Sequence, residues 1–113
     1  MPLFCLKGQY TPEAMHGMMK SGANREEEVR KAIESVGGEL KGFYGIFGDP
    51  EGFHVMIIAE MPGNAQYIAT VVTAVMSGAL ANFRTNVLYT AEEAVEAASI
   101  VNASGVSYRP PTE

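Results

Sequence analysis

The sequence predicts an α+β domain that is built on one antiparallel sheet of four strands. Stretches rich in β-branched and aromatic residues alternate with segments of helical periodicity, in the order strand, helix, strand, strand, helix, strand. A loop of Gly, Asp, Pro, Glu and Gly at residues 48–52 is short enough to join the two middle strands as a hairpin. A chain of 113 residues, 47% of them hydrophobic, is long enough for one such core and predicts a single domain.

The clearest strand is expected at residues 53–60, between the loop at 48–52 and a stop at Pro62-Gly63-Asn64. Side chains alternate between the two faces of a strand. One face is wholly apolar and should meet the core: Phe53, Val55, Ile57 and Ala59. The other face is apolar in the middle and ionisable at both ends: His54, Met56, Ile58 and Glu60. We therefore look for function on this second face.

The other elements follow from strand composition and from helix-capping signals. The remaining strands are expected at residues 3–9, 39–47 and 83–89. Each helix should begin at a residue whose side chain accepts a hydrogen bond from the first turn, and these N-caps are Thr11, Asn24, Asn64 and Thr90. Glu27 and Glu93 lie three residues after Asn24 and Thr90, which is the spacing of a capping box. The helix ends are expected near Gly22, Gly37, Ser77 and Val101.

Right-handed crossovers turn this βαββαβ order into a ferredoxin-like sheet with strand order 4-1-3-2, all neighbours antiparallel. We expect the helices on one face, an extra C-terminal helix, a domain at residues 1–103 and an irregular tail at 104–113. The bare sheet face should carry apolar side chains, or their alternates if the register shifts by one: Phe43, Phe47, Met56, Ile58 and Leu88. Such a face predicts a homodimer, or a higher homo-oligomer, in which two sheets face each other.

Composition argues against several other partners. The net charge is −5 and the basic residues form no cluster, so we expect no nucleic-acid partner. Cys5 is the only cysteine, which excludes an intrachain disulfide, and no signal-peptide pattern precedes it; both features predict a cytoplasmic protein. Residues 61–83 carry no charge but contain too many polar residues for a membrane span. We expect instead a helix that is covered on more than one side, by the sheet and by another helix or a second subunit.

Strand directions predict where chemistry could occur. The first strand runs antiparallel to the third and fourth, so Lys7 at its end should converge with His54 and Arg84 at one rim of the open face. Tyr10 and His16 follow the first strand and should overhang the same rim. Two cations and an imidazole around an apolar cleft suit a small anionic or enol-type ligand, with His54 as the candidate acid or base.

The alternative is structural: Lys7 and Arg84 pair with Glu60, Asp49 or Glu51 and only hold the oligomer together. The sequence predicts no metal site, because its two histidines and single cysteine are far apart. It contains no nucleotide-binding or hydrolase motif, and we expect no cofactor.

Three stretches carry a resemblance to a known family: residues 37–40, residues 52–62, and residues 82–93. In their order and spacing they resemble the GYD domain family, over about residues 3–98. The family is named after a Gly-Tyr-Asp segment, which corresponds here to Gly52-Phe53-His54, so that His54 stands where the family has an acid. The resemblance implies a dimeric α+β barrel in which two ferredoxin-like sheets enclose a shared cavity. The family provides no established catalytic motif, so no catalytic residue is carried over.

Three functions fit these predictions. The first is a homo-oligomeric module that binds a small molecule in a cavity at the sheet face. The second is a cofactor-independent enzyme, monooxygenase- or isomerase-like, with His54 as acid or base and Arg84 or Lys7 stabilising an oxyanion. The third is a structural or interaction module without a ligand. The first two require a cavity at the rim formed by Lys7, His54 and Arg84, whereas the third predicts that side chains fill this rim.

Overall fold

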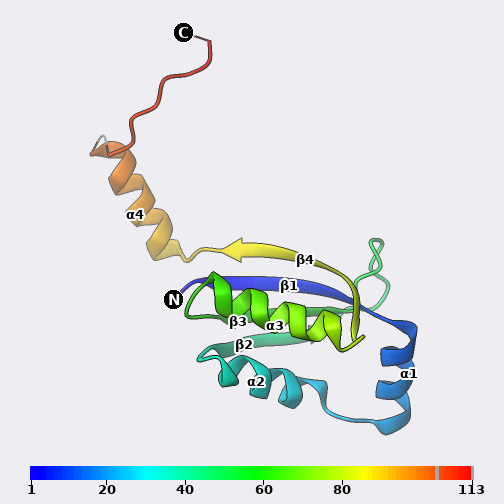
Figure 1. The fold of residues 1–113 in the computed structure, drawn as a ribbon. Helices are drawn as coiled ribbons and strands as arrows, with labels where there is room; N and C mark the ends of the chain where they lie inside the picture. The colour runs from blue at the N-terminus through cyan, green and yellow to red at the C-terminus, as the bar shows by residue number, and fades with distance from the viewer. Residues whose placement is uncertain (104, 113) are drawn as a thin grey trace.

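A computed structural model of the chain describes residues 1–103 and 105–112 (Figure 1). The strands are β1 (Leu3–Tyr10), β2 (Glu39–Gly45), β3 (Val55–Glu60) and β4 (Leu80–Leu88). The helices are α1 (Pro12–Ser21), α2 (Arg25–Ser35), α3 (Asn64–Met76) and α4 (Ala91–Asn102). The sequence predicted each of these elements. Of the predicted tail, residues 104 and 113 lie outside the described part of the chain, and residues 105–112 form neither helix nor strand.

The four strands form one antiparallel sheet in the order β2-β3-β1-β4. This is the predicted order 4-1-3-2 read from the opposite edge, so the ferredoxin-like topology is confirmed. Helices α2 and α3 lie over one face of the sheet, and α1 lies at the end where β1 finishes (Figure 1). Helix α4 projects beyond the end of β4 (Figure 1). In the described part of the chain, no helix covers the second face of the sheet.

The core lies between the sheet and helices α2 and α3. The rings of Phe4 in β1 and Tyr67 in α3 stack with their centroids 4.2 Å apart. The Tyr67 hydroxyl also shares a hydrogen bond of 2.7 Å with the hydroxyl of Thr85 in β4. The other buried members of this cluster are Leu6, Ile33, Leu40, Ala59, Met61 and Val71. Helix α3 is therefore joined to both β1 and β4 through one buried tyrosine.

One extra residue in β2 changes the predicted sheet faces. Between Leu40 and Gly42 the register against β3 shifts by one, so that Phe43 lies opposite Ile57 and packs against the core. Tyr44 lies opposite Met56 and takes the place on the open face that Phe43 was predicted to hold. Phe47 was also predicted on this face, but it follows the end of β2 and is fully exposed. Met56, Ile58 and Leu88 lie half-buried, as the alternation of β3 and β4 predicts.

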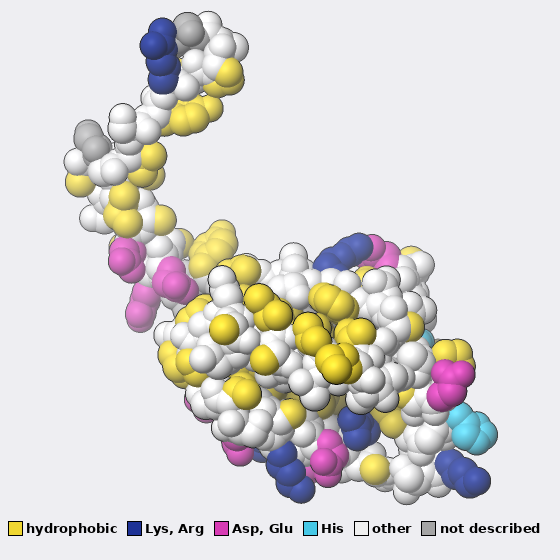
Figure 2. Space-filling model, viewed as in Figure 1, with side chains coloured by type: hydrophobic (Ala, Val, Ile, Leu, Met, Phe, Trp, Pro, Cys, Tyr) yellow, Lys and Arg dark blue, Asp and Glu magenta, His cyan; other side chains and the backbone are white. Residues whose placement is uncertain are grey.

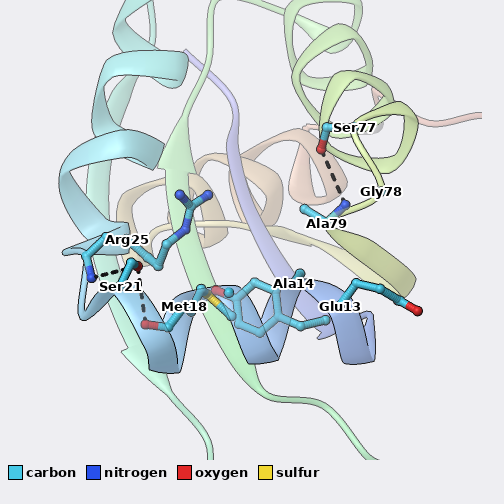
Figure 3. A pocket seen from close by; sticks show the side chains of 11 residues that line it. Glu13, Ala14, Met18, Ser21, Arg25, Ser77, Gly78 and Ala79 are labelled. Atoms are coloured by element: carbon cyan, nitrogen blue, oxygen red, sulfur yellow. Dashed lines mark hydrogen bonds between the residues drawn. The ribbon is translucent and has the colours of Figure 1, made fainter.

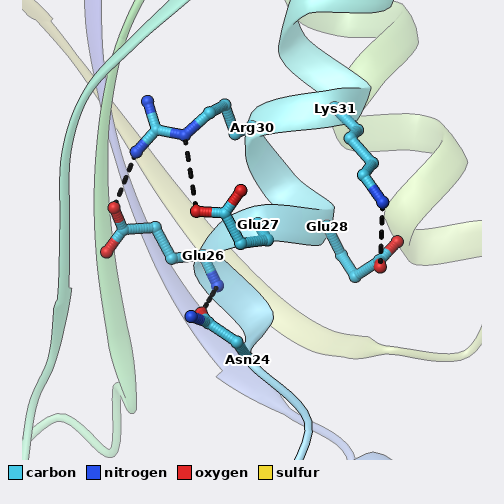
Figure 4. Close-up of polar contacts among 6 residues, drawn as sticks. All are labelled: Asn24, Glu26, Glu27, Glu28, Arg30 and Lys31. Carbon is cyan, nitrogen blue, oxygen red and sulfur yellow. Dashed lines mark hydrogen bonds and ion pairs between the residues drawn. The ribbon is translucent and has the colours of Figure 1, made fainter.

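Helix α2 begins in a network of polar side chains (Figure 4). The predicted cap is confirmed, because Asn24 Oδ1 accepts a hydrogen bond of 3.0 Å from the backbone N–H of Glu26. The predicted capping box does not form: the carboxylate of Glu27 lies 3.8 Å from Arg30 Nε, one turn further along the helix. Arg30 also contacts Glu26 at 2.7 Å. Arg25, the first residue of the helix, takes part in neither of these ion pairs.

Helix α3 has two apolar sides, of which the sheet covers one. Tyr67 and Val71 are buried against the sheet, and an outer stripe is exposed: Ile68, Val72, Val75 and Met76. The N-cap is Gly63 rather than the predicted Asn64, so no side chain caps this helix. Among the described residues, no helix has the length and apolar character needed to cross a membrane. That another helix or subunit covers the outer stripe stays a prediction.

Candidate functional site

A β-bulge places His54 on the helix side of the sheet. The backbone N–H of His54 donates to the carbonyl of Gly8 at 2.8 Å, although Gly8 is already the register partner of Val55. Two consecutive residues therefore oppose one, as in a bulge, and their side chains turn to the same side. Strict alternation had predicted His54 on the open face with Met56. The extra residue is the physical reason for the difference.

The imidazole of His54 is held by Tyr10. Nδ1 accepts a hydrogen bond of 3.1 Å from the backbone N–H of Tyr10. The two rings are almost parallel, at 6° and with their centroids 6.0 Å apart. Because Nδ1 of the neutral ring accepts this bond, the ring proton belongs on Nε2. Nε2–H is therefore the donor that His54 can offer to a ligand.

His54 lines a cavity of ≈750 Å³, which we call the His54 cleft. Its walls come from α1, from the start of α2 and from the end of β2 with the loop that follows it. Most of the lining is apolar, and its large apolar side chains include Met15, Met18, Met19, Phe43, Ile46 and Phe47. The polar side chains of the lining are Tyr10, Arg25 and His54. Three methionines of α1 thus line the cleft.

Arg25 lies where the His54 cleft meets a second hollow. This hollow, of ≈410 Å³, opens between α1 and the turn after α3, and it shares Tyr10, Met18, Ala23 and Arg25 with the cleft (Figure 3). Within the described part of the chain, Arg25 forms no ion pair. Its charge acts on Tyr10 instead: burial raises the pKa of the Tyr10 hydroxyl, and Arg25 offsets part of that rise. The guanidinium is thus available to an anion in either hollow.

The raised pKa values of two tyrosines predict a loss of stability in alkali. Burial raises the pKa of Tyr10 and of Tyr67 above the ordinary 10.0. The unfolded chain therefore releases these protons first, so the stability they contribute is complete below about pH 10. We expect the free energy of unfolding to fall from there upward, until the folded hydroxyls also ionise. Urea unfolding at intervals between about pH 8 and about pH 11 measures this slope. The double variant Tyr10→Phe/Tyr67→Phe should show a shallower slope; an equal slope contradicts the prediction.

Lys7 and Arg84 lie together on the open face of the sheet, as predicted. They are direct partners in the pairing of β1 with β4. Both Nη atoms of Arg84 bond the carboxylate of Glu51, and its guanidinium lies 5.4 Å from the ring centroid of Phe53. Glu51 raises the pKa of Arg84 further. The predicted structural alternative therefore gives the partner of Arg84 correctly, and Glu51 and Phe53 contact Arg84 at this end of the face.

The structure separates the five candidates into groups. Tyr10 and His54 meet at the His54 cleft, whereas Lys7 and Arg84 lie on the other side of the sheet. His16 is exposed on α1 and lines neither hollow. The predicted convergence of His54 with Lys7 and Arg84 is wrong, because the bulge reverses the side chain of His54. Sequence reasoning missed Arg25, which stands before three glutamates and has the appearance of an ordinary solvated helix start.

Comparison with known families places this geometry in context. The model of the GYD domain family matches residues 4–98, from β1 into α4. The chain belongs to the GYD domain family. No curated protein matches the chain. The segment that corresponds to the Gly-Tyr-Asp of the family name, Gly52-Phe53-His54, lies at the bulge: Gly52 has a φ of 83°, Phe53 is buried beside Arg84, and His54 turns to the cleft. In this GYD domain the segment therefore presents its aromatic and its polar residue to opposite sides of the sheet.

Proposed function

We propose that this GYD domain binds a small, largely apolar organic anion in the His54 cleft. The observation that carries the proposal is the composition of the cleft: an apolar wall around Tyr10, Arg25 and His54. Its volume of ≈750 Å³ lies within the range of small-molecule sites. One unpaired cation and one fixed N–H donor in such a wall favour a ligand with a single anionic end.

Each polar group has a distinct part in this binding mode. Arg25 offers a planar, permanently charged fork that matches a carboxylate. His54 offers Nε2–H, because its Nδ1 is engaged by Tyr10. The α1 methionines are flexible and polarisable, so they can adapt to an aromatic or branched ligand body. Arg25 and His54 thus recognise the charged end of the ligand, and the methionines contact its apolar body.

Benzoate and phenylacetate are suitable test ligands, with neutral benzamide as their uncharged counterpart. We expect both carboxylates to shift the NMR signals of the His54 ring, and Arg25→Ala to weaken their binding by about tenfold or more through loss of a charge-assisted hydrogen bond. Benzamide should respond less to Arg25→Ala, because it carries no charge.

Lys7→Ala and Arg84→Ala are the matched controls, since they remove a cation from the opposite side of the sheet. Both should leave the dissociation constants for benzoate and phenylacetate within about twofold. If these two variants abolish binding while Arg25→Ala does not, the ligand site lies on the open face and the proposed site is wrong.

Self-association through the open face is the second part of the proposal. The apolar side chains of this face are Tyr44, Met56, Ile58 and Leu88, with Ile58 in its middle row. One end carries Lys7 and Arg84, and the other carries Glu39 and Glu60, which share Lys41 at 3.2 and 3.6 Å. A two-fold axis across the strands would set the cationic end of one copy against the acidic end of the next. The expectations of a cytoplasmic protein without nucleic-acid or membrane partners stay predictions.

Catalysis by His54 also stays a prediction. The imidazole is oriented by a backbone amide and not by a carboxylate, so nothing in the described contacts strengthens it as a base. Binding is the function that these contacts support best.

A further inference from the structure

The described chain exposes more surface than a folded monomer of its mass. Its accessible surface is 7806 Å², whereas a compact protein of 12.1 kDa exposes about 6,000 Å². Its radius of gyration is 17.7 Å, against about 13 Å for a compact domain of this length. The excess surface, roughly 1,800 Å², exceeds the ~800 Å² per partner that a stable interface needs. The described chain therefore exposes surface that a single compact domain of this size would bury.

Part of this excess lies on α4, and part lies on the irregular residues 105–112. Every residue of this helix is exposed, including Val95 at 71% and Val101 at 67%. The N-terminus of the helix is stabilised, because Thr90 and Glu93 form the predicted capping box. An isolated helix of 12 residues is nevertheless marginal in water and depends on packing against a partner surface.

The sequence of α4 defines the side that needs a partner. Helical spacing gathers five of its apolar residues into one stripe: Ala91, Ala94, Val95, Ala98 and Val101. Ile100 lies on the other side of the helix. Its three glutamates lie on the opposite side of the helix: Glu92, Glu93 and Glu96. The stripe contains three alanines, Ala91, Ala94 and Ala98, and such small side chains allow a partner surface to approach closely. Figure 2 shows hydrophobic side chains along this projecting segment and, separately, over the body of the domain.

A complementary surface lies between α3 and β4. We call it the α3–β4 groove: a hollow of ≈300 Å³ whose lining includes Phe4, Ile68, Val71, Val72 and Phe83. None of the described residues that line this hollow is charged. Ile68 and Val72 are 57% and 45% exposed, and Phe83 is 44% exposed. The groove is thus an uncharged apolar surface that includes Ile68 and Val72 of the outer stripe of α3.

We propose that α4 of one copy packs in the α3–β4 groove of a second copy, and that α4 of the second copy packs in the groove of the first. The charges agree with this arrangement: the uncharged stripe meets an uncharged groove, while the glutamates on the far side stay in water. Each chain supplies one helix and one groove, so a two-fold exchange fills both. Only Tyr89 and Thr90 separate β4 from α4, and they direct the helix away from its own sheet (Figure 1). This pairing uses the helix side of the domain and is independent of the ligand site.

Sedimentation equilibrium of the full chain tests the pairing. Ala98→Glu places a charge in the stripe of α4, and Val72→Glu places one in the groove. Each variant should halve the weight-average mass of the wild type at the same concentration. Glu96→Gln on the far side of α4 is the matched control and should keep the wild-type mass. Far-UV circular dichroism establishes that all four proteins are folded.

An equimolar mixture of the Ala98→Glu and Val72→Glu chains shows whether the contact joins two copies. The first chain keeps an intact groove and the second keeps an intact α4, so the weight-average mass of the mixture should rise above that of either variant alone. Adding Ile58→Lys on the open sheet face to both chains should leave this recovery intact, which distinguishes the pairing from association through the sheets. The proposal is overturned if either variant keeps the wild-type mass, or if the mixture stays at the mass of the separate variants.

Discussion

Phe4→Ala is expected to lower the free energy of unfolding by about 3–5 kcal/mol, a large share of the 5–15 kcal/mol typical of a domain. Phe4 is 4% exposed in the central strand β1, and its ring stacks on Tyr67. Truncation leaves a cavity beneath α3 and also removes the surface against which Tyr67 is oriented. Because Tyr67 bonds Thr85, the loss should extend to the contact between α3 and β4. Urea unfolding at neutral pH measures the change.

Val87→Ala is the matched control for this prediction. Val87 lies directly opposite Phe4 in the pairing of β1 with β4, yet its side chain is 69% exposed. Its truncation removes little buried area, so we expect a loss of less than about 1 kcal/mol. Equal losses for the two variants would show that Phe4 is not part of a closely packed core.

The topology could be predicted because each element has a local signature. Thr11, Asn24 and Thr90 cap their helices as the sequence predicts, and the hairpin loop makes β2 a neighbour of β3. Once the elements are in order, the handedness of crossovers leaves few possible sheets. Strand order therefore follows from signals that each lie within a few residues.

The sheet faces were harder to predict, because a bulge has no composition of its own. One extra residue near Lys41 turns Phe43 toward the core, and one at His54 turns the imidazole toward α1. Both positions have the residue types of a regular strand. Reasoning from alternation thus placed most strand residues in the correct strands and assigned some of them to the wrong side. It also extended the second strand to Phe47 and began the third at Phe53, whereas β2 ends at Gly45 and β3 begins at Val55.

The candidate site depends on where α1 and the start of α2 lie relative to the strands, and strand alternation does not predict this. Arg25 reaches the cleft because α1 and the following turn place the start of α2 beside Tyr10. That placement is set by packing between segments distant in the sequence, and no local pattern reports it. Only the ending of α1 at Gly22, where φ is 65° and the backbone N–H bonds Met18, has a signature in the sequence.

Gly38→Ala is the second substitution with a large expected effect, and its cause is a lack of space. An added Cβ would lie 2.6 Å from Met61 Sδ, 2.8 Å from the carbonyl oxygen of Glu60 and 2.9 Å from Ile33 Cγ2. Met61 and Ile33 are 1% and 2% exposed, so neither can move into solvent. The Glu60 oxygen belongs to the backbone of β3 and is fixed by the sheet. We expect the free energy of unfolding to fall by about 3 kcal/mol, the upper end of typical overpacking.

Gly17→Ala provides the contrast in the same chain. Gly17 lies within α1, and nothing stands within 4 Å of its would-be Cβ. Alanine restricts the unfolded chain and favours the helix, so this variant should gain about 0.5–1 kcal/mol. Parallel urea titrations of both variants therefore separate the two roles of glycine.

Gly38 permits β2 to leave α2 directly beside Met61, which positions Phe43 at the wall of the His54 cleft. A Gly38→Ala variant as stable as the wild type would mean that α2 and β2 separate without cost, and that the cleft wall is not held by this junction.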